Sequence, residues 1–186
     1  SFAYGEVMVN AMATIFKKIK LETHENIGSG PIHLPEEELH TNATWLSLPE
    51  AWVTEMGRNE LEQGLIGLAQ MLRTLAAFRV MCDTQDIFAA PQVKAVHSEQ
   101  PTIFLYDRYP GGIGLAEQVF KEWPELLREV EQAITHCACQ GGCPSCVGTH
   151  DQAGQGTRSG QEQASQKSFV LKLIRRILKK DELHVH

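Results

Sequence analysis

The sequence predicts an α+β protein in which an N-terminal β-hairpin or small sheet precedes a mainly helical domain with a four-cysteine site. Apolar residues alternate with polar ones near the N-terminus, and after about residue 50 they recur at helical spacing. Four of the five cysteines stand together in residues 137–146. We therefore expect a β-rich connecting segment over residues 1–50 and a helical domain, which carries the cysteines, over residues 51–186.

The first fifty residues read as a strand, a turn and a returning strand. Apolar residues occupy most odd positions of residues 6–21, which predicts a strand with one buried face. The segment "ENIGSGP" (25–31) supplies Asn, Gly and Pro, which are typical of turns. Residues 32–48 look extended again, with a break at Pro35. Together these segments predict a long hairpin or a small sheet.

A long helix is predicted for residues 59–82, because leucines recur there at steps of four and three. This leucine face consists of Leu61, Leu65, Leu68, Leu72 and Leu75. A second apolar face is formed by Ile66, Ala69, Ala76 and Val80. We therefore expect the helix to be buried on more than one side.

The middle of the chain predicts one strand and two helices. The segment "PTIFLYD" is rich in strand-forming residues and ends at Asp107. Turn residues in "RYPGG" then lead into a helix from about Ile113. Pro124 suits the first turn of the next helix, which runs directly to Cys137.

The last part of the chain predicts a polar loop and an amphipathic helix. Residues 147–167 contain much Gly, Gln and Ser and almost no apolar residue, so we expect a mobile loop. In the closing helix an apolar face opposes a basic one. The basic face consists of Lys172, Arg175, Arg176, Lys179 and Lys180.

The cysteines follow the spacing C-x-C-x3-C-x2-C, and they are Cys137, Cys139, Cys143 and Cys146. Four thiolates suit tetrahedral Zn²⁺, whose sulfur-only sites are closed and structural. An iron–sulfur cluster is the alternative, because it also takes four cysteines. Disulfides are disfavoured, because such short loops strain the bond geometry. With four protein ligands no open position remains for a water molecule, so we expect the metal to perform no reaction.

Several function classes are excluded by what the sequence lacks. No apolar run reaches about 18 residues and no signal peptide is visible, so we expect a cytoplasmic protein without a membrane span. The motif G-x-x-x-x-G-K-[ST] is absent, so this chain alone should not hydrolyse ATP. "DELH" (181–184) lacks the preceding strand of a helicase acidic box. "PGGIGLA" (110–116) is more typical of close backbone packing at a strand-to-helix turn than of a phosphate loop.

Three segments, "RVMCDTQDI", "IFLYDRYPGGIGLAEQVF" and "CACQGGCPSCVG", resemble the zinc-binding C-terminal domain of a DEAD/DEAH-box repair helicase family that includes mitomycin repair factor A. The resemblance covers residues 60–150 and carries the family's metal ligands onto the four clustered cysteines. It implies that two RecA-like motor domains lie upstream and drive ATP-dependent 3′-to-5′ movement on DNA. This chain would then be an accessory domain that engages single-stranded or forked DNA or shapes the strand channel.

A different class of function stays open, namely a zinc-stabilised protein-interaction module that makes no nucleic-acid contact. The formal net charge of −6 argues against an independent, strongly basic DNA clamp. The candidate DNA-binding residues are Arg108, Tyr109, Lys172, Arg175, Arg176 and Lys179. The cations near the C-terminus of the last helix also favour its dipole and solubility without any ligand.

Overall fold

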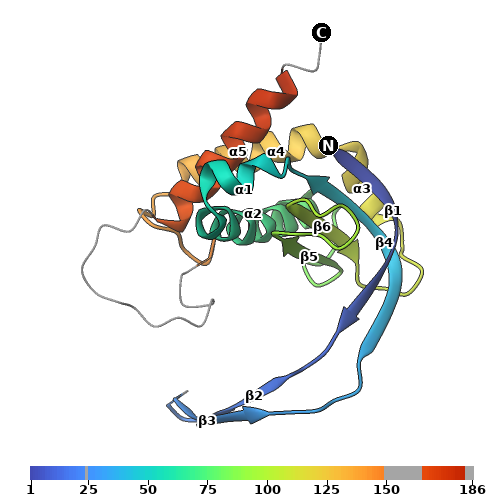
Figure 1. Ribbon diagram of the computed structural model, residues 1–186, viewed down its shortest axis with the longest axis vertical. Coiled ribbons are helices and arrows are strands. Elements are labelled where there is room, and N and C mark those ends of the chain that lie inside the picture. The colour runs from blue at the N-terminus through green and yellow to red at the C-terminus, as the bar shows by residue number, and fades with distance from the viewer. Residues whose placement is uncertain (24, 149–164, 183–186) are drawn as a thin grey trace.

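The computed structural model describes residues 1–23, 25–148 and 165–182, and it confirms the α+β class (Figure 1). A four-stranded antiparallel sheet has the order β1-β4-β6-β5. Its strands are β1 (Phe2–Ala11), β4 (Glu37–Ser47), β5 (Ile87–Gln92) and β6 (Thr102–Asp107). The helices are α1 (Ala51–Met56), α2 (Arg58–Arg79), α3 (Leu115–Lys121), α4 (Trp123–His136) and α5 (Gln166–Glu182).

Strand β4 joins two parts of the molecule. It pairs with β1 along its whole length, from Phe2 opposite Leu46 to Ala11 opposite Glu37. It pairs with β6 only over its C-terminal half, residues 43–47. The other half of β4 therefore extends with β1 beyond the sheet. A two-stranded ribbon of β2 (Ile15–Ile19) and β3 (Asn26–Pro31) continues in the same direction.

We call residues 9–39 the arm; it curves away from the helices in Figure 1. The prediction of one buried face is wrong for the arm, because Ile15 is 66% exposed and Leu21 is 92% exposed. Alternation correctly indicates extended chain, but no helix packs over the described part of the arm, so both of its faces meet solvent. Its exposed large apolar residues are Met12, Ile15, Phe16, Ile19, Leu21, Ile27 and Leu34.

Helix α2 forms the centre of the helical body, as its leucine pattern predicts. Leu61, Leu65, Leu68 and Leu72 are fully buried, and α2 packs against α4, α5 and β5. The predicted second apolar face is only partly buried, because Ile66 is exposed. The helix also contains Gly67, whose missing side chain lets α5 approach closely. A Cβ atom at this position would lie 2.7 Å from Cγ2 of Val170.

Buried polar contacts fix α3 and α4 against the sheet. The indole N–H of Trp123, the first residue of α4, donates to Oγ1 of Thr44 on β4 at 2.7 Å. The carboxylate of Asp107 at the end of β6 is fully buried and accepts four backbone N–H groups, those of residues 113–116. The glycine turn before α3 thus already holds an anion of its own, which confirms a structural role for "PGGIGLA".

Strand β5 is absent from the sequence prediction. It lies at the edge of the sheet. An edge strand tolerates Pro91, although proline has no N–H that could donate a hydrogen bond to a neighbouring strand. Most of the polar segment predicted as a mobile loop, residues 149–164, lies outside the described residues. Among the helices that are described, none combines the length and apolarity required to cross a membrane.

Candidate metal centre

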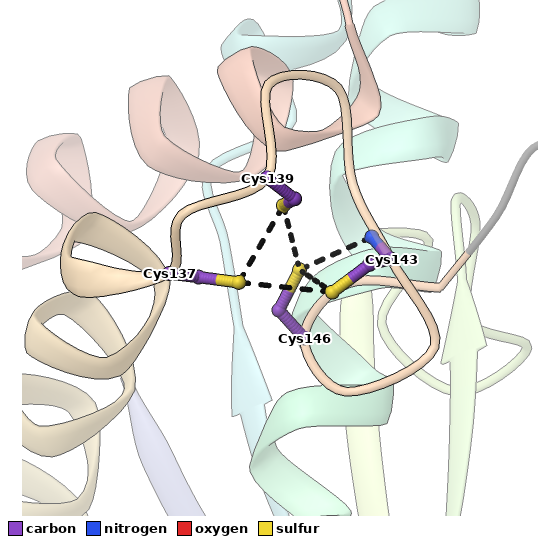
Figure 2. A group of neighbouring side chains, drawn as sticks. All are labelled: Cys137, Cys139, Cys143 and Cys146. Carbon is purple, nitrogen blue, oxygen red and sulfur yellow. Dashed lines mark hydrogen bonds between the residues drawn. The ribbon is translucent and has the colours of Figure 1, made fainter.

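The four clustered cysteines lie on one loop between α4 and α5. Cys137 directly follows α4, and its N–H still donates to Ala133 in the last helical turn at 3.1 Å. The loop then turns back at Cys143, whose carbonyl accepts the N–H of Cys146 and of Gly148, each at 3.0 Å. This turn points the four sulfur atoms toward one another (Figure 2).

The sulfur positions fit a single tetrahedral ion. All four Sγ atoms lie within 4.8 Å of one another. Cys139 lies 3.5 Å from both Cys137 and Cys146, measured between sulfurs, whereas a disulfide bond is about 2.05 Å long. A zinc ion with Zn–S bonds of about 2.3 Å requires sulfurs about 3.8 Å apart, close to these separations. An iron–sulfur cluster spreads its thiolates over several irons, so it needs a wider arrangement.

The local environment gives two of the thiols very different acidities. A backbone hydrogen bond from Cys139 lowers the pKa of Cys137 to about 7. Burial raises the pKa of Cys146 to about 12. Cys137 therefore loses its proton more readily than Cys146, and metal binding to thiolates releases protons.

Helix α2 packs against the cysteine loop. Nε2 of Gln70 donates to the carbonyl of Pro144 at 3.2 Å, which anchors the turn between the last two cysteines. Val147 packs against Gly67, and a Cβ atom there would lie 3.2 Å from the Val147 carbonyl. Sequence reasoning missed Gln70, because nothing in the spacing of α2 indicates which polar residue faces a distant loop.

Two other side chains of a metal-binding type, those of His136 and Cys82, do not join the cluster. His136 immediately precedes Cys137, but its Nδ1 lies 2.8 Å from the Gln132 carbonyl, one helical turn earlier. Cys82 is half-buried against the core, and its thiol donates to the Asp83 carbonyl at 3.3 Å. The metal-ligating group found among the described residues therefore consists of the four cysteines alone.

The predicted basic face of α5 lies beside acidic residues of other helices. Nζ of Lys172 pairs with Glu60 at 3.0 Å, and Nε of Arg175 pairs with Glu131 at the same distance. Arg176 pairs with Glu55 and lies over the Trp52 ring, 4.3 Å from its centroid. Lys179 is exposed. Three of these four cations therefore hold α5 against α1, α2 and α4.

Arg108 and Tyr109 follow β6, next to the glycine turn. The Arg108 guanidinium lies 5.0 Å from the ring centroid of Phe88. The Tyr109 hydroxyl donates to Oδ1 of Asp86 at 2.7 Å, and this carboxylate contact raises the tyrosine pKa. Both side chains are exposed, so this end of the sheet presents an aromatic ring and a cation to solvent.

Comparison with known proteins shows what the part of the chain that carries the cysteines resembles. Residues 68–147, which include all four clustered cysteines, match the family model described as the MrfA Zn-binding domain. These residues are similar to an MrfA Zn-binding domain. The resemblance predicted from the sequence is thereby confirmed.

Three of the similar proteins are much longer than this chain. The chain is 56% identical over 149 residues to the "Uncharacterized ATP-dependent helicase YprA" of Bacillus subtilis (strain 168), covering 80% of the chain and 20% of that relative. A crystal structure of the DUF1998 helicase MrfA bound to DNA matches 95% of the chain and 22% of its own length, with 48% identity and a TM-score of 0.71. MrfA bound to DNA and AMPPNP matches 94% of the chain and 22% of its length, with 45% identity and a TM-score of 0.63. The chain therefore spans about a fifth of the length of these relatives.

Proposed function

We propose that this chain is the zinc-stabilised accessory C-terminal domain of an ATP-dependent 3′-to-5′ DNA helicase of the DNA-repair type. It helps to engage DNA or shapes the channel for the DNA strand. The observation that carries the proposal is the similarity over 95% of the chain to a helicase crystallised with DNA. In this proposal the RecA-like motor domains of the longer, cytoplasmic protein hydrolyse ATP, and this chain performs no reaction.

The four cysteines of the cluster are the proposed zinc ligands. When bound, zinc neutralises part of the thiolate charge and links the end of α4 to the turn at Cys143–Cys146. A site with four protein thiolates leaves no position for a substrate, so the role of the metal is structural. The single-ion sulfur spacing and the match to a zinc-binding domain both support zinc over an iron–sulfur cluster.

For DNA contact we favour Arg108, Tyr109 and Lys179 among the candidate residues. Lys172, Arg175 and Arg176 already pair with carboxylates of the same chain, so phosphate would have to compete for them. Arg108 and Tyr109 offer a cation and a stacking ring, and proteins that bind single-stranded nucleic acid combine these two kinds of group. The partner in this proposal is single-stranded or forked DNA.

A fluorescence anisotropy titration with labelled single-stranded and forked DNA tests the proposal. The zinc-loaded chain should bind in the micromolar range at low salt, with a log–log salt slope of about −0.7 for each single-strand phosphate contact. The variant R108A should bind more weakly than the parent chain. The matched control is K121A, whose exposed lysine pairs with Glu117, and it should bind normally. Absence of binding at low salt would contradict direct DNA engagement.

The exposed apolar arm favours a second candidate, a protein-interaction module without DNA contact. A two-stranded ribbon is marginally stable alone in water, and seven large apolar side chains of the arm meet solvent. This candidate predicts no DNA binding at low salt. It also predicts concentration-dependent association in analytical ultracentrifugation, which the double replacement I15S/I19S on the arm should abolish.

A further inference from the structure

The beginning of α5 lies directly on the cysteine loop. The backbone N–H of Lys167 donates to the Gly141 carbonyl at 3.2 Å. Its side-chain Nζ donates to the carbonyls of Cys137 and Cys139, at 2.6 and 2.9 Å. One lysine therefore forms hydrogen bonds to the backbone carbonyls of both cysteines of the C-x-C pair.

Lys167 is an unusual lysine, because it is only 9% exposed. Within the described part of the chain, no carboxylate lies at salt-bridge distance from its ammonium group. A buried charge costs free energy unless another charge or well-placed dipoles compensate it. The two carbonyl dipoles compensate part of this cost, and they belong to the residues whose sulfurs face the metal centre.

The metal centre can supply the negative charge that compensates the ammonium group of Lys167. Four thiolates around one divalent ion carry a net charge of −2, which in turn needs compensation in a partly buried site. Lys167 holds the backbones of two of those four ligands, so its positive charge stands next to this excess. The positive charge of Lys167 and the net negative charge of the metal centre therefore compensate each other.

We propose that Lys167 is a positioning residue and counter-cation of the metal centre, and that it couples metal binding to the docking of α5. The proposal rests on the zinc site proposed above. Residues that hold metal ligands from outside typically change metal affinity by about 10- to 100-fold when replaced. Zinc should accordingly fasten α5 to the loop, and loss of zinc should release Lys167.

Metal affinity of matched variants provides the first test, measured for the whole chain by competition with a chromogenic chelator. K167M keeps the length of the side chain but removes its charge, and K167Q keeps a neutral hydrogen-bond donor. Both should bind zinc about 10- to 100-fold more weakly than the parent chain. The control K172M removes another lysine of α5, which is exposed and pairs with Glu60 of α2. The zinc affinity of this control should equal that of the parent chain. A cobalt-loaded K167M should also show shifted thiolate-to-metal charge-transfer bands, which a purely structural loss would not produce.

Amine labelling of the parent chain provides a second test that needs no variant. In the zinc-loaded chain an acetylating reagent should modify Lys172 but spare Lys167, as measured by peptide mass spectrometry. After chelation Lys167 should become reactive, while Lys172 stays as reactive as before. Equal labelling of Lys167 in the two states would overturn the coupling, even if the variants failed to fold.

The two proposals fail in different ways. If the parent chain binds neither zinc nor cobalt, the metal site itself is wrong. If the parent chain binds zinc and K167M binds it equally well, the metal site stands and the role of Lys167 is overturned.

Discussion

Asp107 accepts the backbone N–H of Ala116 at 2.7 Å, so a buried carboxylate at the end of β6 caps the beginning of α3. Three further N–H groups converge on its other oxygen. This side chain therefore helps to fix the direction in which the chain leaves the sheet toward α3 and α4.

Replacing Asp107 by Ala should lower the free energy of unfolding by roughly 2–4 kcal/mol, because four N–H groups lose a charged acceptor. Urea denaturation of the zinc-loaded chain measures this change. The control E117Q alters an exposed acidic residue of α3 and should shift stability by less than about 1 kcal/mol. An Asp107 variant as stable as the control would contradict the capping role.

Replacing Gly67 by Ala should destabilise the chain by about 1–3 kcal/mol, although Ala favours a helix more than Gly does. The added methyl group would meet Val170 of α5 and the Val147 carbonyl next to the cysteine loop. Thermal unfolding gives the size of the effect. G28A is the matched control, because nothing lies within 4 Å of a Cβ atom at that position. Recovery of stability in the double variant G67A/V170A would identify the clash as the cause.

Each of the four clustered cysteines should be necessary for stoichiometric zinc. Elemental analysis of the parent chain should give about one zinc per chain. Replacement of any one of the four by Ser should lower the zinc content and loosen the fold, because metal binding is coupled to folding. C82S removes the thiol outside the cluster and should keep its full zinc content. Iron in place of zinc would support the cluster alternative.

Zinc affinity should increase with pH. Below pH 7 zinc must displace protons from both Cys137 and Cys146, whose pKa values are about 7 and about 12. Above pH 7 Cys137 is already ionised, so binding releases one proton fewer and the slope of affinity against pH decreases. Chelator competition between pH 6 and 8.5 measures this slope. An affinity independent of pH would contradict the acidities assigned to these thiols.

The sequence was sufficient for features that depend on local pattern. The leucine spacing predicted α2, and the cysteine spacing predicted sulfurs that the structure brings within 4.8 Å of one another. Alternation on the arm predicted strands but not their exposure, because periodicity does not show whether another element covers a face. The prediction that Lys167 ends a mobile loop was wrong, because Lys167 lies in the first turn of α5 and its burial depends on how α5 meets a loop that is distant in the chain.

The two ladders of the arm are separated by a short interval, residues 12–14 on one side and residues 32–36 on the other. Within this interval the described backbone hydrogen bonds across the arm reduce to one, from Ile32 to Thr14. Continuous pairing stiffens the β1–β4 ladder on one side, and the β2–β3 ladder on the other side is paired apart from a register shift between Lys18 and Ile19. Because one backbone hydrogen bond joins the two paired segments, we expect the arm to bend most easily at this interval.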